Sequence, residues 1–324
     1  MTIGYIGLGN MGSALANRLM LKHSLVVFDA NERSIQPFIE AGAARATDLS
    51  DVARQCSTIF LCLPTSAHVE DVLFGSAGLA DHLQRGTVII DQTTGDPRET
   101  CRLAAAVEKL GCHLVDAPVS GGRVGAEAGT IAIMVGASDA LYARVVPVLG
   151  SISVNVYRAG EIGSGHVVKL VNNLMSGAQR VLSLEAIALA TKFGVDPHVA
   201  NEILLKGGAR NAFLEKVMGP RVLHGDLNIG FTLELAHKDL RLACQLGMDF
   251  GVPLFLGNVA REIYAMAMSE EGNAAQVDTL ALFYDRLAST NMVPTDYDAG
   301  SMLAPEAFKN KKTTSAAVAG SVGL

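Results

Sequence analysis

One stretch near the start of the chain decides the fold of its first half: Gly4-Tyr5-Ile6-Gly7-Leu8-Gly9-Asn10-Met11-Gly12. It follows an apolar, β-branched run and precedes residues 11–21, which have helical periodicity. In such a unit the first glycine allows the turn, the second admits a phosphate, and the third lets the helix pack closely. The helix start then offers N–H groups to an anion. We therefore expect a dinucleotide pyrophosphate site made by Gly7, Leu8, Gly9, Asn10, Met11 and Gly12.

Outward from this stretch, short β-branched runs alternate with helical segments as far as about residue 158. The runs are residues 3–6, 25–28, 58–63, 87–91, 113–116, 131–135 and 153–157. Nearly continuous apolar strands that alternate with helices predict βαβ units and a mainly parallel sheet with helices on both faces. We expect an α/β fold, with a Rossmann-type, doubly wound, dinucleotide-binding domain in residues 1–163.

Beyond about residue 165 the strand patterns stop. Residues 166–193 predict one long helix that ends at Gly194 and could join two domains. Further helices are expected at residues 198–206, 233–250, 254–269 and 278–289. An all-α domain is therefore predicted for residues 164–298. Residues 299–324 are small and polar without periodicity, which is typical of a flexible tail.

The composition narrows the class of protein. The net charge of −6 gives no reason to expect nucleic acid or an anionic membrane as a partner. The five cysteines are scattered without a CxxC pair, which favours free thiols in a reducing compartment. No signal sequence and no long uncharged apolar run is visible, so we expect a cytoplasmic protein, or one of an organelle matrix if a longer precursor exists. The histidines are scattered, so no metal site is predicted. The sequence has no GxSxG motif, so a serine hydrolase is not predicted either.

The cofactor type is indicated by Asp29, which ends the second predicted strand, 20 residues after Gly9. A carboxylate there accepts hydrogen bonds from ribose hydroxyls and repels a 2′-phosphate, which favours NAD over NADP. Nearby Arg33 could accept that phosphate, so NADP stays an alternative, and Asp29 could instead cap the following helix. Further cofactor contacts are expected where other strands end; they are Leu63, Pro64 and Thr94. The alternatives are that Leu63 and Pro64 only form a turn at the end of a strand, and that Thr94 only caps the following helix.

Three further motifs, taken with the opening stretch, show a resemblance to a known family. They are Asp116-Ala-Pro-Val-Ser120-Gly121-Gly122-Arg123-Val-Gly125-Ala, Gly163-Ser-Gly165-His-Val-Val-Lys169-Leu-Val-Asn-Asn173 and Lys238-Asp239-Leu-Arg-Leu-Ala243. Together with the opening stretch, and in the same order, they resemble the β-hydroxyacid dehydrogenase family over residues 1 to about 295. This resemblance implies hydride transfer between NAD(H) and a small anionic 3-hydroxy acid or its semialdehyde. It also implies a homodimer or homotetramer formed through the helical domain.

In that family the lysine at the position of Lys169 is the catalytic acid/base. The residues themselves agree, because oxidation of an alcohol needs a group that takes the hydroxyl proton. A lysine can do this near neutral pH when desolvation lowers its pKa, and residues 167–171 are otherwise apolar. His166, one turn earlier, is expected to tune it. The alternative is an ordinary lysine on a helix surface.

Other site residues are expected around Lys169. Asn173 shares its helix face and could position the substrate, or else join two helices by a hydrogen bond. Ser120, Gly121 and Gly122 could hold a substrate carboxylate through a hydroxyl and backbone N–H groups, or form a simple turn. The resemblance implies that Lys238 lies near the nicotinamide and substrate, with Asp239 holding its helix. The alternative for this pair is two exposed neighbouring charges.

The substrate itself is left open. Residues 207–211 are expected to face it, and where many relatives are rich in serine this chain has Arg210 and Asn211. Arg123 and Arg210 are candidate anion contacts, or else solvated surface arginines. The same chemistry on tartronate semialdehyde, threonate, sulfolactaldehyde or a larger hydroxy acid is therefore an alternative. A non-catalytic, cofactor-bound scaffold is a remote one, against which the presence of Lys169 stands.

Overall fold

A computed structural model describes residues 2–294, so the predicted tail at residues 299–324 lies outside the described part. Contacts divide the chain into two compact units. The first consists of Met1–Leu182 with Gly230–Ala275, and the second of Ser183–Ile229 with Gln276–Leu324. This division follows compactness and not the change from strands to helices near residue 163, so the predicted domain boundaries stay a prediction.

The first unit contains a nine-stranded sheet. Its strands are β1 (Thr2–Ile6), β2 (Ser24–Phe28), β3 (Ala44–Arg45), β4 (Thr58–Leu61), β5 (Val88–Asp91), β6 (His113–Asp116), β7 (Val119–Ser120), β8 (Ala132–Gly136) and β9 (Val156–Gly160). They run in the order β3-β2-β1-β4-β5-β6-β8-β7, with β9 beside β8. The β6–β8 and β7–β8 pairs are antiparallel and the others are parallel. The predicted mainly parallel sheet is confirmed, and its order reverses between β1 and β4, where such sheets bind ligands.

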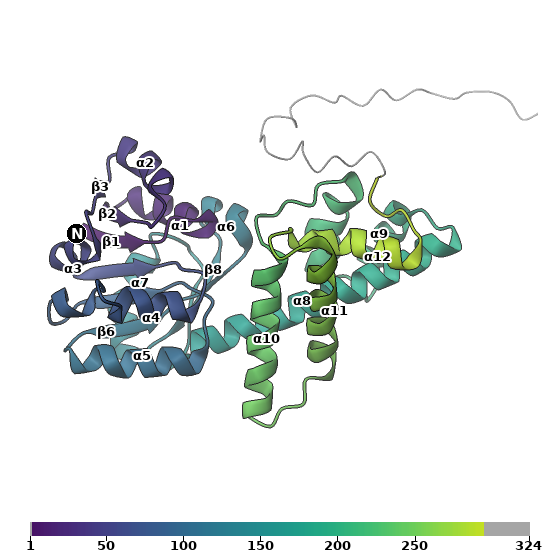
Figure 1. The fold of residues 1–324 in the computed structure, drawn as a ribbon. Coiled ribbons are helices and arrows are strands. Elements are labelled where there is room, and N and C mark those ends of the chain that lie inside the picture. Colours follow the sequence, from purple (N-terminus) through teal and green to yellow (C-terminus); the bar gives the residue numbers. More distant parts are fainter. Residues whose placement is uncertain (1, 295–324) are drawn as a thin grey trace, which may run out of the picture. The chain divides into compact units, whose positions relative to one another are not determined.

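Helices cover both faces of this sheet (Figure 1). They are α1 (Asn10–Met20), α2 (Glu32–Glu40), α3 (Leu49–Gln55), α4 (Ser66–Phe74), η1 (Ala80–His82), α5 (Pro97–Lys109), α6 (Gly122–Ala128) and α7 (Asp139–Leu149). Neighbouring strand residues enter two different apolar clusters, as Ile89 and Ile90 do. This alternation shows a sheet that is buried on both sides, as the apolar runs predicted.

After β9 the described chain contains helices and no further strand. These are α8 (Ser164–Phe193), α9 (Pro197–Lys206), a π-helical turn η2 (Leu214–Met218), η3 (Val222–His224), α10 (Leu233–Asp249), α11 (Phe255–Glu271), η4 (Val277–Thr279) and α12 (Leu280–Ala288). The predicted helices are confirmed, and Gly194 follows α8 with φ +102°. Helices α10 and α11 and the first part of α8 belong to the first unit. In residues 2–294 no helix has the length and hydropathy needed to cross a membrane.

Candidate functional site

The glycine loop connects β1 to α1, and each of its glycines meets a different demand. Gly7 has φ +93°, and a Cβ there would collide with the carbonyl oxygen of Cys62. A Cβ on Gly12 would collide with the carbonyl oxygen of Gly7. Around Gly9, by contrast, no atom of the described chain lies within 4 Å of the place a Cβ would take, and the residue is exposed. Packing therefore requires Gly7 and Gly12, while Gly9 borders open space.

Helix α1 begins at this open space. Gly9 is its N-cap, and no described side chain caps the helix. The N–H groups of the first turn, at Asn10, Met11 and Gly12, are those that an α-helix leaves without internal partners. The Asn10 side chain donates through Nδ2 to the carbonyl oxygen of Gly230, 2.8 Å away, and does not cap the turn. Open space next to unsatisfied N–H groups fits the pyrophosphate of a dinucleotide.

Asp29, just after β2, fastens the loop. One carboxylate oxygen accepts the N–H of Leu8 at 2.6 Å, and the other accepts the N–H of Asn31 at 2.7 Å. The Leu8 N–H is therefore used within the protein. Asn31, not Asp29, is the N-cap of α2, so the alternative role of Asp29 as a helix cap is not realised. Each oxygen retains a further lone pair for a ribose hydroxyl.

Four predicted cofactor residues come together at the ends of β4 and β5. The Lys238 Nζ donates to the carbonyl oxygens of Thr94 at 2.6 Å and Pro64 at 3.1 Å. The N–H of Leu63 donates to the hydroxyl of Thr93 at 3.1 Å, beside Thr94. Asp96, not Thr94, caps α5. We call Leu63, Pro64, Thr94 and Lys238 the ledge.

A hydrogen-bonded network surrounds Lys169, and we call it the lysine centre. The Lys169 Nζ donates to Asn173 Oδ1 at 3.0 Å, and Asn173 Nδ2 donates to Asp239 Oδ2 at 2.6 Å. Asn172 Nδ2 donates both to Asn173 Oδ1 and to Ser120 Oγ, each at 3.0 Å. The sequence analysis missed Asn172, although its spacing of three residues from Lys169 could have placed it on the same helix face. Of the two N–H bonds of the Asn173 amide, this network uses one.

Electrostatics make Lys169 suitable for proton transfer. Burial lowers the pKa of Lys169 to about 8, the nearby carboxylate of Asp239 opposes this shift, and the ammonium of Lys238 adds to it. Lys169 is only 9% exposed, so the alternative of a surface lysine is excluded. The Lys238–Asp239 pair, with Nζ and Oδ1 3.1 Å apart, is also largely buried and not the exposed alternative.

The surroundings of Lys169 agree in part with the expectation. Burial is the largest cause of its lowered pKa, as expected, and the neighbouring Leu170 is fully buried, whereas Val168 and Val171 are 43% and 46% exposed. The His166 imidazole contacts Thr100 and Thr93 and is not among the causes of this pKa shift, so its expected tuning of Lys169 stays a prediction. Neighbouring residues on one helical turn face different surroundings.

The predicted substrate turn follows β7. Gly121 and Gly122 have φ values of +138° and +67°, which favour glycine, and both residues are exposed. Ser120 Oγ accepts a hydrogen bond from Asn172 at 3.0 Å, and a hydroxyl that accepts can still donate its own proton. Arg123 donates through Nη1 to the carbonyl oxygen of Asn10 at 3.0 Å, so it ties this turn to the glycine loop.

Arg210 and Asn211 belong to the second unit, and their recorded partners lie within it. Arg210 forms an exposed ion pair with Glu215 at 2.8 Å. Asn211 Oδ1 accepts the N–H groups of Phe213 and Leu214 at the start of η2. Asn211 Nδ2 also donates to Ser183 Oγ at 3.0 Å, so its side chain organises the segment.

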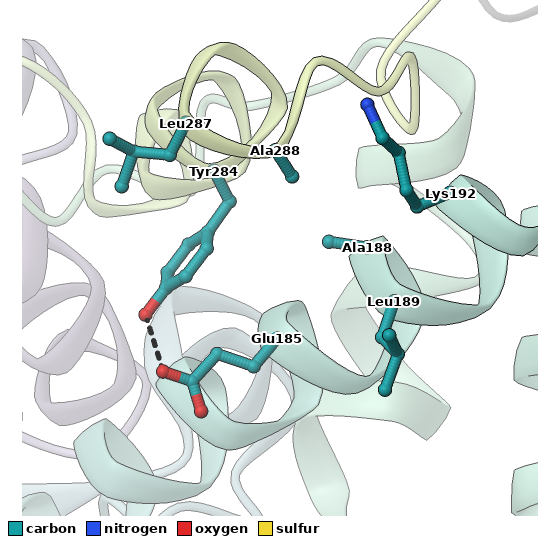
Figure 2. Close-up of a pocket in the computed structure, with 7 residues that line it drawn as sticks. All are labelled: Glu185, Ala188, Leu189, Lys192, Tyr284, Leu287 and Ala288. Atoms are coloured by element: carbon teal, nitrogen blue, oxygen red, sulfur yellow. Dashed lines mark hydrogen bonds between the residues drawn. The ribbon is translucent and has the colours of Figure 1, made fainter.

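A pocket of about 370 Å³ lies within the second unit (Figure 2). Helices α8 and α12 form it, and Tyr284 donates to Glu185 across it at 3.1 Å. None of the predicted site residues lines it. Among residues 2–294, no three His, Cys, Asp or Glu side chains are grouped so that they could hold a metal ion.

Comparisons with known proteins show the family of this chain. A family model described as the NAD binding domain of 6-phosphogluconate dehydrogenase matches residues 2–160. A second one, described as "NAD-binding of NADP-dependent 3-hydroxyisobutyrate dehydrogenase", matches residues 163–284. The 2-(hydroxymethyl)glutarate dehydrogenase of Eubacterium barkeri is 38% identical over 281 residues, which cover 85% of this chain and 93% of that protein.

Two further relatives extend the comparison. The 3-sulfolactaldehyde reductase of Escherichia coli is 34% identical over 266 residues, which cover 82% of this chain and 89% of that enzyme. The solved structure of 3-hydroxyisobutyrate dehydrogenase from Mycobacterium tuberculosis with L-serine has a TM-score of 0.78 and 26% identity. It covers 88% of this chain and 98% of that one.

The sheet topology, the family models and the relatives together define an oxidoreductase with an NAD(P)-binding Rossmann domain. The chain belongs to the 3-hydroxyisobutyrate dehydrogenase family, whose members are NAD(P)-dependent hydroxyacid dehydrogenases.

Proposed function

We propose that this enzyme interconverts a small 3-hydroxy acid and its semialdehyde with NAD(H), and that Lys169 is the general acid/base. The observation that carries the proposal is the buried Lys169, whose pKa is lowered to about 8 and whose Nζ is held by Asn173. A group with a pKa near the working pH can both take and return a proton. The bound nicotinamide would accept or supply the hydride. Lys169 would take the hydroxyl proton during oxidation and donate it to the carbonyl oxygen during reduction.

The substrate anion is proposed to bind at Ser120, Gly121 and Gly122. The Ser120 hydroxyl is supported as a donor because Asn172 already occupies a lone pair of its oxygen. The two exposed glycines leave their backbone N–H groups accessible, as an anion-binding nest requires. Asn173 would use its remaining N–H to orient the substrate oxygen beside Lys169.

The M. tuberculosis relative was solved with L-serine, which is itself a 3-hydroxy acid. The E. barkeri and E. coli relatives act on molecules with a second anionic or polar group. A second candidate is therefore the same reaction on an acid with a charged substituent. Proposed contacts are Arg123 and Arg210, because their ion pairs with Glu127 and Glu215 are exposed and cost little to exchange. Asn211 would fix the position of Arg210.

NAD is the proposed cofactor in preference to NADP. Asp29 accepts two backbone N–H groups, which fixes its carboxylate beside the glycine loop. A 2′-phosphate near that carboxylate would be repelled, whereas ribose hydroxyls could donate to it. We expect a higher kcat/KM with NAD, and Asp29→Asn should reduce the preference. A preference for NADP in the unchanged enzyme would overturn this part.

We also propose a homodimer or homotetramer in the cytoplasm. Large apolar side chains of α8 are exposed in the single chain, among them Leu189 at 74% and Phe193 at 90%, which favours burial in an assembly. Sedimentation equilibrium would test it, and a monomer at micromolar concentration would contradict it. The domain boundaries at residues 163 and 298 remain part of the proposal.

The decisive experiment compares Lys169→Ala with Lys192→Ala, an exposed lysine on the same helix. Reduced nicotinamide is followed by absorbance with 3-hydroxyisobutyrate, 2-(hydroxymethyl)glutarate, threonate and the reduced form of sulfolactaldehyde. We expect Lys169→Ala to lose at least about 1000-fold in kcat while NAD binding, measured by calorimetry, persists. Lys192→Ala should match the unchanged enzyme. Near-normal turnover of Lys169→Ala would refute the assigned role.

A further inference from the structure

A buried polar cluster lies where β5 and β6 end and α8 begins. Its members are Asp116, His166, Thr93 and Thr100, of which only His166 was expected to act on Lys169. The Asp116 carboxylate accepts the N–H of Gly163 at 2.7 Å and of His166 at 2.8 Å. It thereby caps the start of α8, five residues before Lys169. Asp116 and His166 are both fully buried. A satisfied network at this depth fixes the elements that it joins.

The His166 ring makes two hydrogen-bond contacts, and its Nδ1 also lies 4.0 Å from Asp116 Oδ2. Its Nε2 lies 2.7 Å from the carbonyl oxygen of Thr93, and its Nδ1 lies 2.8 Å from the hydroxyl of Thr100. Because a carbonyl oxygen can only accept, Nε2 carries the proton in the first contact. These two hydrogen bonds, one to each ring nitrogen, orient the imidazole.

Thr93 connects His166 to the ledge through further hydrogen bonds. Its hydroxyl accepts the N–H of Leu63 at 3.1 Å, and its own N–H donates to Asp91 at 2.9 Å. The next residue, Thr94, accepts Lys238 Nζ. One side chain on α8 thus holds the backbone from which the ledge is built, and Lys169 is one turn further along the same helix.

We propose that His166 is a positioning residue whose Nε2–H bond to Thr93 fixes Lys169 relative to the ledge. This inference rests on the proposed role of Lys169 and on the ledge as a cofactor support. Without the bond, the first turn of α8 and the end of β5 could shift apart, although each would keep its own secondary structure. Even a shift of about 1 Å between a catalytic group and its reaction partner is costly. Lys169 would also lose part of the burial that lowers its pKa.

The test replaces His166 with two amide side chains of different length. In His166→Gln the side-chain nitrogen can take the place of Nε2 and donate to Thr93. In His166→Asn the nitrogen takes the place of Nδ1, so the Thr100 contact survives and the Thr93 contact is lost. Both variants bury the same polar group, which makes their costs in stability comparable. We expect kcat within about threefold of the unchanged enzyme for Gln and at least about tenfold lower for Asn.

A second measurement needs no activity and no cofactor. Competitive acylation of the enzyme over pH 6–11, read by mass spectrometry, gives the apparent pKa of Lys169. We expect a value near 8 in the unchanged enzyme and in His166→Gln, and a higher value in His166→Asn. Equal kcat and equal Lys169 pKa in the two variants, at similar melting temperatures, would overturn the inference. If His166→Asn does not fold, a tenfold loss in folded His166→Gln would overturn it.

Lys169→Ala, assayed in parallel, separates the two proposals. Normal turnover of Lys169→Ala would refute the role of the lysine, while the acylation data would still report whether His166 fixes its position. An inactive Lys169→Ala together with an unimpaired His166→Asn would refute the positioning role alone.

Discussion

The glycine loop and the lysine centre lie in the same compact unit but are built in opposite ways. The loop is six consecutive residues, and its shape follows from where a Cβ cannot fit. The lysine centre is assembled from side chains on β7, α8 and α10, with partners 52 and 66 residues apart in the chain. The loop keeps its shape because its glycines have no Cβ atoms. The lysine centre keeps its shape because its buried polar side chains hydrogen-bond to one another. The two should therefore respond differently to substitution.

The largest expected effect lies in the loop. Gly12→Ala forces a Cβ against the carbonyl oxygen of Gly7 and should cost about 1–3 kcal/mol of stability together with NAD affinity. Gly9→Ala meets no protein atom and should keep its melting temperature, yet lose at least about 100-fold in NAD affinity because its methyl group blocks the pyrophosphate. Thermal unfolding and calorimetry check both. Tight NAD binding by Gly9→Ala would show that the cofactor does not approach this residue.

The second effect is on stability at the lysine centre. The pKa of Lys169 falls from 10.5 in the unfolded chain to about 8 in the folded one. Between these values the unfolded chain binds more protons, so this group makes stability rise with pH from about 8 to 10.5. Below pH 8 the buried charge costs about 3 kcal/mol. Lys169→Met should therefore unfold at higher denaturant concentration at pH 7, with the difference narrowing at pH 10. A variant less stable than the unchanged enzyme at pH 7 would contradict this.

The two regions also differ in how far they could be predicted from the sequence. The loop, the parallel strands and the long helix were predictable because their signals are local, a glycine pattern or a periodicity. Strands β3 and β7 were not, because two residues carry no periodicity. The Lys169 motif was visible, but the role of Asn172 and the link from His166 to Thr93 were not. Their partners, 52 and 73 residues away, become neighbours only in the folded chain.

The third effect is a shift in pH dependence. Oxidation needs neutral Lys169, so its rate should rise through a midpoint near pH 8, and reduction should fall through the same midpoint. Asp239→Asn removes the charge that raises this pKa and should move the midpoint down by about one unit. Lys238→Gln removes a charge that lowers it and should move the midpoint up. Shifts of both variants in the same direction would mean that the charges act through structure and not through their fields.

The smallest effect concerns Asn172. Asn172→Ala removes one partner of Ser120, so KM for the acid should rise about three- to tenfold while KM for NAD stays constant. Ser120→Ala should have a similar effect. The double variant should be no worse than the poorer single one, because both changes break the same hydrogen bond. Additive losses would show that the two side chains act independently.

Arg123 connects the two regions, because it stands in the first turn of α6 and donates to Asn10 at the start of α1. Binding of NAD at the glycine loop, or of the acid at the turn of residues 120–122, would change the preferred position of the Arg123 guanidinium. Thermodynamic linkage then requires that, by whatever factor NAD changes the affinity for the acid, the acid changes the affinity for NAD by the same factor. We expect a cooperative ternary complex whose coupling weakens in Arg123→Gln, although each ligand still binds alone. One arginine would thus give the enzyme a preference for binding its two ligands together.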